Sequence, residues 1–179
     1  NITNLEIGIQ GLLEKNERLV SLNLNGDYNT LQNKLNLGFV FSDFIVSDFV
    51  GNKNENGLKI DVPIDGKISA EIDIAQIMNN KEDVVEHIDD IIKNINFQVN
   101  GGKGEVVFNE QQRFNYAIDS FVLEGTVSGG LDAVTIRDAD FETAGQKTRL
   151  SLDVSGYKKY FFEKSLKDLK IVFSIFPPD

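Results

Sequence analysis

Residues 20–26 read Val-Ser-Leu-Asn-Leu-Asn-Gly, and their pattern predicts the fold of this chain. Apolar and polar residues alternate strictly, and in an extended strand this alternation places the apolar side chains on one face and the polar ones on the other. The same pattern recurs at residues 60–66 and 150–156, each time ending at glycine. Glycine permits the tight turns between neighbouring strands. The pattern therefore predicts an antiparallel sheet with one buried face, one wet face and hairpins at these glycines.

Similar alternation continues along most of the chain and gives about ten strands, separated by turns rich in glycine and asparagine. The sequence thus predicts a mainly β fold, an antiparallel meander that forms a curved sheet or half-barrel. No linker divides the chain, so we expect a single β-rich domain over residues 1–179. Because the chain opens at asparagine rather than methionine, we expect this domain to belong to a longer precursor.

An irregularity is predicted near Asp43. The triplet Ser-Asp-Phe occurs at residues 42–44 and again at 47–49, five positions apart. Because five is odd, the two copies would lie on opposite faces of a regular strand. A bulge or bend near Asp43 would bring them back into phase.

One segment departs from the β alternation and predicts a helix. Over residues 81–95 the apolar residues recur at spacings of one, three and four, which makes a single stripe along an α-helix. Acidic residues at the start of the segment favour this helix through its dipole. We therefore expect one amphipathic helix over residues 81–95, packed on the sheet, with its stripe formed by Val84, Val85, Ile88, Ile91, Ile92 and Ile95.

Charge and cysteine content exclude several functional classes. The chain has 28 Asp and Glu against 18 Lys and Arg, a formal net charge of −10. A field of that sign repels nucleic acid and anionic bilayer surfaces. The absence of cysteine excludes disulfides, thiolate zinc sites and a cysteine nucleophile. No apolar run approaches the roughly 20 residues of a membrane-spanning helix, and no motif predicts a cofactor.

A possible cation site consists of Asp138, Asp140 and Glu142, which alternate on one face of a predicted strand. Three carboxylates in a row repel one another unless a cation or nearby lysines relieve them, and calcium takes such hard oxygen ligands. A regular strand spaces these residues about 7 Å apart, too far to share one ion without a bend. The solvated face of an amphipathic strand is therefore the favoured interpretation over a metal site.

Aromatic residues supply the best candidates for a binding surface. The chain has 13 Phe and 4 Tyr, several of them consecutive in the sequence. Consecutive aromatics in a strand point to opposite faces, so they form either an exposed patch or a strand covered on both sides. Both alternatives stay open. The predicted ligand-binding or partner-binding residues are Tyr157, Tyr160, Phe161, Phe162, Phe39 and Phe41.

The functional hypothesis is a non-enzymatic binding or scaffold protein of the bacterial envelope. It would lie outside the cytoplasm, in the periplasm or at the cell surface, as a lipoprotein or other protein anchored through a preceding segment. Its apolar sheet face would hold a lipid or another apolar ligand. The first alternative is a protein–protein interaction or adhesion module that uses a sheet edge or the aromatic patch. The second is a carboxylate-based hydrolase.

Overall fold

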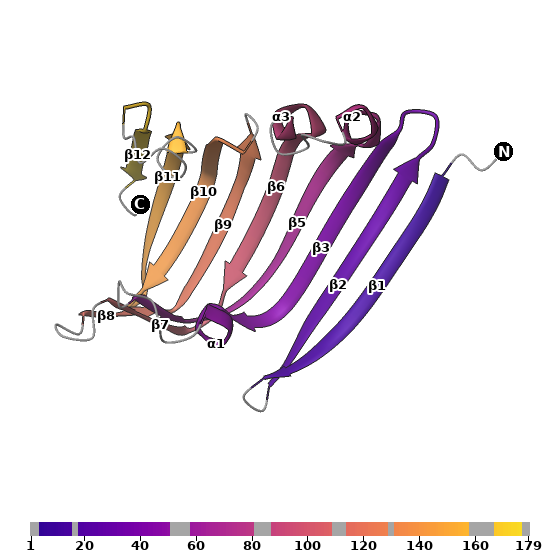
Figure 1. Cartoon of the computed structure of the whole chain (residues 1–179). Helices are drawn as coiled ribbons and strands as arrows, with labels where there is room; N and C mark the ends of the chain where they lie inside the picture. Colours follow the sequence, from indigo (N-terminus) through magenta and orange to yellow (C-terminus); the bar gives the residue numbers. More distant parts are fainter. Residues whose placement is uncertain are drawn as a thin grey trace.

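The computed structural model shows a mainly β protein built from a nine-stranded antiparallel sheet and a small three-stranded sheet (Figure 1). The predicted fold class is confirmed at this level. Only short helices accompany the strands among the described residues. The structure describes residues 4–15, 18–50, 58–80, 87–108, 114–128, 131–157 and 167–176.

The large sheet follows the order of the chain from one edge to the other, so each strand pairs with the next one that joins the sheet. Every pairing in it is antiparallel. Its strands are β1 (Asn4–Lys15), β2 (Arg18–Asn29), β3 (Lys34–Ile45), β5 (Pro63–Asp73), β6 (Ile92–Gly101), β9 (Ser120–Ser128), β10 (Ala133–Thr143), β11 (Gln146–Ser155) and β12 (Lys170–Phe176).

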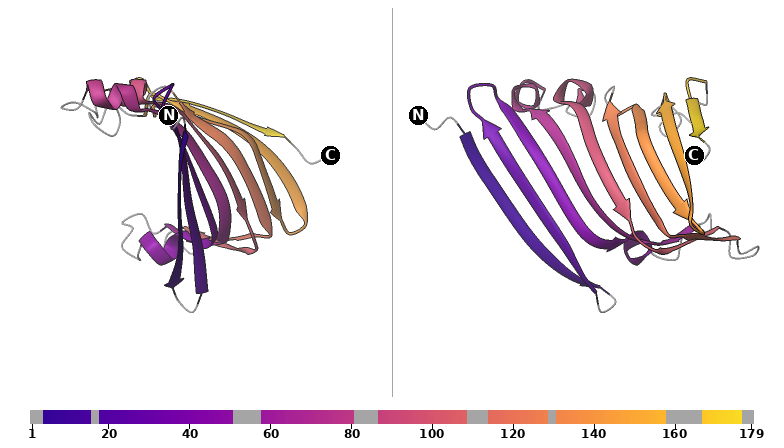
Figure 2. Two further views of the ribbon diagram at one scale, coloured as in Figure 1. Left: turned by 90° about the vertical axis from the view of Figure 1, so that its right-hand side faces the viewer. Right: turned by 180° about the vertical axis from the view of Figure 1, so that it is seen from behind.

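The remaining elements lie at the two ends of the large sheet (Figures 1 and 2). One end carries α1 (Val46–Val50) and the small sheet of β4 (Leu58–Asp61), β7 (Gly104–Phe108) and β8 (Phe114–Ile118). The other end carries α2 (Ile74–Asn79) and α3 (Ile88–Ile91). Figure 2 shows that the sheet is bowed and that the helices at both ends project from its concave side. The sheet does not close into a barrel, since β1 and β12 form its opposite edges.

The predicted helix over residues 81–95 is wrong from Ile92 onward. Only Ile88–Ile91 is helical among the described residues of that segment, and residues 81–86 lie outside the described residues. Ile92 begins β6 and pairs with Ile72, and Ile95 pairs with Ala70. Three steps along β6 therefore match two steps along β5, because β6 carries a bulge. The bulge produced the spacing of three that resembled a helical stripe.

Glycine ends only one of the three alternating segments. Gly156 follows the end of β11, with a φ of +74° that suits a turn. Gly26 and Gly66 instead lie inside β2 and β5. The predicted hairpin at Gly66 is wrong because this glycine pairs on both sides, with Phe41 and with Val99.

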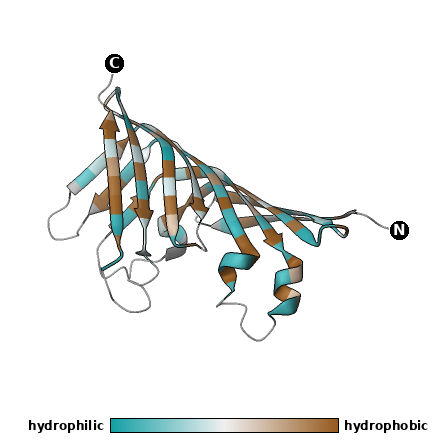
Figure 3. Ribbon diagram, turned by 90° about the horizontal axis from the view of Figure 1, so that it is seen from above, coloured by the Kyte–Doolittle hydropathy of each residue, from teal (hydrophilic) through white to brown (hydrophobic). Residues whose placement is uncertain are grey.

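Alternation separates the large sheet into an apolar face and a polar face. On β5 the even-numbered residues from Ile64 to Ile72 belong to the apolar face. Figure 3 shows the resulting alternation of hydrophobic and hydrophilic segments along the strands. The bulge predicted near Asp43 is confirmed: the register with β5 shifts between Phe41 and Phe44, and Asp43 has a φ of 57°. The shift keeps both phenylalanines on the apolar face.

Backbone hydrogen bonds show that the apolar face is the concave one. The Ile74 N–H donates to the Asn33 carbonyl (2.8 Å), and the Gly102 N–H donates to the Pro63 carbonyl (2.9 Å). Bonding groups alternate between the two sides of a strand, so even-numbered β5 residues direct their backbone groups toward β3. In Figure 1 the chain runs upward along β5, and β3 lies to the right of it. In a strand that runs upward, an L-residue whose backbone N–H and C=O groups point to the right has its side chain toward the viewer. The even-numbered side chains of β5 therefore point toward the viewer in Figure 1. The helices project to the same side.

Candidate functional site: the apolar face

The apolar face extends without interruption across all nine strands of the large sheet. Cross-strand partners on this face are apolar or glycine over almost its whole extent, as the registers show. Large side chains on it include Leu5, Ile7, Ile9, Leu13, Leu22, Leu24, Leu35, Leu37, Phe39, Phe41, Ile64, Ile68, Ile72, Ile95, Phe97, Val99, Phe121, Leu123, Val127, Val134, Ile136, Phe141, Leu150, Leu152, Val154, Ile171, Phe173 and Ile175.

Little of this face is fully buried. Among the described residues, only six hydrophobic side chains are buried, and they are Val20, Phe41, Val62, Ile91, Ile118 and Ala139. Side chains on the central strands are half-buried by their neighbours, whereas those on the edge strands are open, such as Ile9 at 59% and Phe173 at 66% exposure. Since a closed core would bury its large side chains almost completely, the described residues form a trough rather than a core.

Aromatic rings line the floor of the trough beside glycines. Phe41 lies opposite Gly66, Phe97 opposite Gly125, and Phe121 opposite Gly101. In each pair a Cβ on the glycine would overlap the ring, so the ring occupies the space above the glycine backbone. A ring that lies over a glycine covers the backbone at that point and projects only a short way above the sheet. The trough therefore has an even, wide floor.

Direct ring contacts strengthen two parts of the floor. The ring centroid of Phe41 lies 5.7 Å from that of Phe39 and 5.9 Å from that of Phe44. On the other half of the sheet, the rings of Phe121 and Phe141 stack with centroids 5.8 Å apart. Such pairs contribute about 0.5–1.5 kcal/mol beyond the area they bury. They hold the floor together through contacts within the sheet.

Three strands carry bulges that keep the apolar face continuous. The register shifts between Phe41 and Phe44 on β3 and between Ile92 and Ile95 on β6. It also shifts between Ile136 and Ala139 on β10. Each extra residue bends its strand and increases its twist. The bulges therefore add to the bow of the sheet while returning the apolar residues to the concave side.

The structure separates the aromatic residues that the sequence proposed for binding. Phe39 and Phe41 lie together on the apolar face. Tyr157 follows Gly156 just beyond β11 and is half-buried. Burial, and secondarily the charge of Asp132, raise the pKa of its hydroxyl. Tyr160, Phe161 and Phe162 lie outside the described residues.

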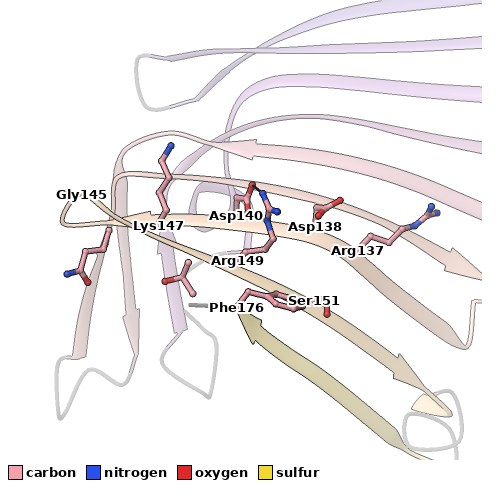
Figure 4. Close-up of a pocket in the computed structure, with 10 residues that line it drawn as sticks. Arg137, Asp138, Asp140, Gly145, Lys147, Arg149, Ser151 and Phe176 are labelled. Atoms are coloured by element: carbon pink, nitrogen blue, oxygen red, sulfur yellow. Dashed lines mark hydrogen bonds and ion pairs between the residues drawn. The ribbon is translucent and has the colours of Figure 1, made fainter. Parts of the chain in front are cut away.

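The acidic residues proposed as a cation site point away from the trough. Asp138, Asp140 and Glu142 pair with β9 residues on the polar face. Asp140 accepts a hydrogen bond from Arg149 Nε at 2.8 Å, and this bond lowers the pKa of its carboxyl (Figure 4). The described residues contain no group of three His, Cys, Asp or Glu side chains arranged to hold a metal ion.

Cross-strand polar pairs cover the polar face. Lys34 and Glu71 form an ion pair at 2.7 Å, which raises the pKa of the lysine, and Gln98 Nε2 donates to Glu124 at 2.6 Å. A shallow hollow on this face is lined by charged side chains, including those shown in Figure 4. The polar face thus carries several cross-strand polar pairs. The apolar face, whose large side chains are continuous from strand to strand, is the candidate functional surface.

Within the part of the chain that the structure describes, no helix is long and apolar enough to cross a membrane. Sequence reasoning identified the apolar face but not that it forms a trough, because a filled core and an open trough use the same alternation.

Comparisons with protein-family models, with curated proteins and with solved structures give no match.

Proposed function

We propose that this chain is a non-enzymatic binding protein that holds the acyl chain of a lipid, or a similar apolar ligand, along the apolar face. The observation that carries the proposal is an apolar face that is continuous across the sheet, exposed on the strands near its two edges and half-buried on its central strands. Monomeric soluble proteins rarely expose a contiguous apolar surface of this kind, and such a surface marks a binding site.

The dimensions of the apolar face suit an extended hydrocarbon chain. Nine strands spaced about 4.8 Å apart make it roughly 38 Å across. The hydrocarbon core of a bilayer is about 30 Å thick, so one leaflet contributes acyl chains of roughly half that length. A bowed, open sheet of half-barrel type gives such a chain contact from below and from both sides. Transfer of the chain from water to this surface would gain about 0.8 kcal/mol per buried methylene.

The proposal includes a location outside the cytoplasm, in the envelope of a bacterium. The support is compositional, since the acidic net charge and the absence of cysteine are compatible with this location. Fractionation of cells that produce the protein from its own gene tests this part. Recovery in the cytosolic fraction would contradict it.

A matched pair of variants tests the ligand site. Leu24 on the apolar face and Val40 on the polar face lie on adjacent strands and are 38% and 48% exposed. In a titration with a fluorescent long-chain fatty acid, Leu24→Asp should weaken binding by about tenfold or more, because it places a charge against hydrocarbon. Val40→Asp should leave the affinity unchanged. Equal effects of the two substitutions would contradict binding at the apolar face.

Native mass spectrometry of protein purified without detergent tests occupancy directly. A stoichiometric extra mass that organic solvent extracts as lipid is the expected result. A ligand-free mass, together with no binding of the fluorescent fatty acid by the unaltered protein, would overturn the proposal.

The carboxylate hydrolase has less support. Such an enzyme needs one carboxyl whose pKa is raised so that it can act as a general acid. Among the described carboxyls, those of Asp61 and Asp140 have pKa values clearly different from the ordinary value, and both pKa values are lowered. Hydrogen bonds from Lys59 and Ser47 cause the shift at Asp61, and the bond from Arg149 causes it at Asp140.

A further inference from the structure

The edge strand β1 presents a regular, unpaired side. It pairs with β2 over its whole length without a register shift, and no described strand lies on its other side. The hydrogen bond from Ile74 N–H to the Asn33 carbonyl fixes which backbone groups face outward. The registers of β5 with β3, of β3 with β2 and of β2 with β1 extend this assignment from β5 to β1. The N–H and C=O groups of the even-numbered β1 residues therefore point to the free side of the strand.

This edge has few of the features by which proteins prevent strand pairing, and its charged residues are Glu6 and, near its end, Glu14 and Lys15. From Leu5 to Glu14 it contains no Lys, Arg or Pro and no bulge. The opposite edge differs, since β12 has seven residues against twelve and is followed in the sequence by Pro177. Each edge strand has one lysine at an end, Lys15 in β1 and Lys170 in β12. Short length, lysine and proline protect an edge, whereas a long, apolar, regular edge is open to addition of another strand.

The sequence of β1 is complementary to itself in one antiparallel register. With a two-fold axis at Ile9, Ile9 faces its copy, Leu5 meets Leu13 of the second chain, and the apolar faces remain on the same side. In this register Glu6 lies opposite a leucine, so no like charges meet. Moving the axis to Gln10 sets Glu6 against Glu14, and moving it to Gly8 pairs fewer residues. The axis at Ile9 therefore fits best.

We propose that β1 pairs antiparallel with β1 of a second copy of this chain, about a two-fold axis at Ile9. The pairing joins the two large sheets into one and makes their apolar faces continuous. It also covers Ile7 and Ile9, which are 53% and 59% exposed in the single chain. This interface does not depend on lipid binding, because it is formed by backbone groups at the edge of the sheet.

A single cysteine tests the interface, since the chain has none of its own. In the proposed register Ile9 and its copy form a non-hydrogen-bonded pair, with Cα atoms about 4.5 Å apart, within the range of a disulfide. Ile9→Cys should therefore form a covalent dimer when diamide oxidises the two thiols to a disulfide. Gln10→Cys should not, because residue 10 faces residue 8 of the other chain.

Phe173→Cys is the control for the opposite edge, at a position 66% exposed on the apolar face of β12. It should stay monomeric on a non-reducing gel. Crosslinking of Phe173→Cys, or equal crosslinking of Gln10→Cys and Ile9→Cys, would overturn the proposed edge or register.

Sedimentation of the unaltered protein gives a measurement that does not depend on cysteine. We expect a mass twice that of one chain at high concentration. Ile9→Lys places like charges opposite each other at the axis and should raise the dimer dissociation constant by about tenfold or more. An unchanged circular dichroism spectrum would show that this variant still folds. A monomeric mass at every concentration, with no crosslink at residue 9, would overturn the proposal.

Discussion

The two faces of the large sheet consist of alternate residues of the same strands, yet they differ in how their side chains are paired. On the polar face, partners such as Arg149 and Asp140 satisfy one another across neighbouring strands. On the apolar face the side chains pack sideways, ring against glycine or ring against ring, and the described helices lie only at its two ends. Several polar side chains therefore find partners within the sheet itself, whereas large apolar side chains near its edges keep surface available for contact.

The largest expected difference between the faces concerns Phe41, which is 8% exposed and contacts two other rings. Phe41→Ala should lower the free energy of unfolding by about 3 kcal/mol, because it leaves a cavity beneath those rings. Val40→Ala, next to it on the polar face, should cost less than about 1 kcal/mol. Urea denaturation monitored by circular dichroism measures both. Equal losses would remove the energetic distinction between the faces.

A smaller effect is expected from adding one methyl group to each face. Gly66→Ala on the apolar face should cost about 1–3 kcal/mol, since the new Cβ would overlap the ring of Phe41 and lie 3.0 Å from the Gln98 carbonyl oxygen. Gly8→Ala on the polar face of β1 has no atom within 4 Å of the new Cβ. It should be neutral or stabilising by about 0.5 kcal/mol.

Thermal unfolding of the two alanine variants, compared with the unaltered protein, measures this difference. A neutral Gly66→Ala would mean that the ring does not rest on the glycine, and the even floor of the trough would need another explanation.

The smallest expected effect belongs to the ion pair on the polar face. Arg149 and Asp140 have side chains 59% and 50% exposed, so a double-mutant cycle should give a coupling of only about 0.2–1 kcal/mol near neutral pH. The bond from Arg149 lowers the pKa of Asp140 below its ordinary value of 3.8. The stabilisation is therefore present above pH 3.8 and is lost as the pH falls through the lowered pKa.

Repeating the cycle at a pH below that lowered pKa should reduce the coupling to zero. A coupling that persists in acid would contradict its dependence on an ionised Asp140. A coupling larger than the free energy of unfolding lost in Phe41→Ala would reverse the ranking of the two faces.

Alternation along residues 20–26 was enough to predict the antiparallel sheet and its apolar face, because side chains in a strand have a strict period of two. The bulge predicted near Asp43 is present, although the second Ser-Asp-Phe triplet that suggested it lies in α1 and not on the same strand. The helix over residues 81–95 failed for a related reason. The bulge in β6 set Ile92 and Ile95 three residues apart on one face, and three is also a helical spacing.

The site was predictable only in part. Phe39 and Phe41 are predicted as binding candidates and lie on the trough floor, but the sequence pattern predicts a turn at Gly66, which lies beneath the ring of Phe41. Gly66 carries no local signal that distinguishes a turn from a ring contact, because the ring comes from Phe41 on another strand. Whether the apolar face is covered depends on elements distant in the sequence, and periodicity carries no information about them.

The bulges have one more consequence, which concerns insertions and deletions in the gene. Within a regular strand, loss of one residue turns every later side chain to the wrong face. Loss of Asp43 would instead leave Phe41 and Phe44 two positions apart, the spacing of a regular ladder opposite Gly66 and Ile64. The mutation would straighten the strand without exchanging its faces. The bulged positions are therefore where this sheet tolerates a change in length, and where its curvature can vary one residue at a time.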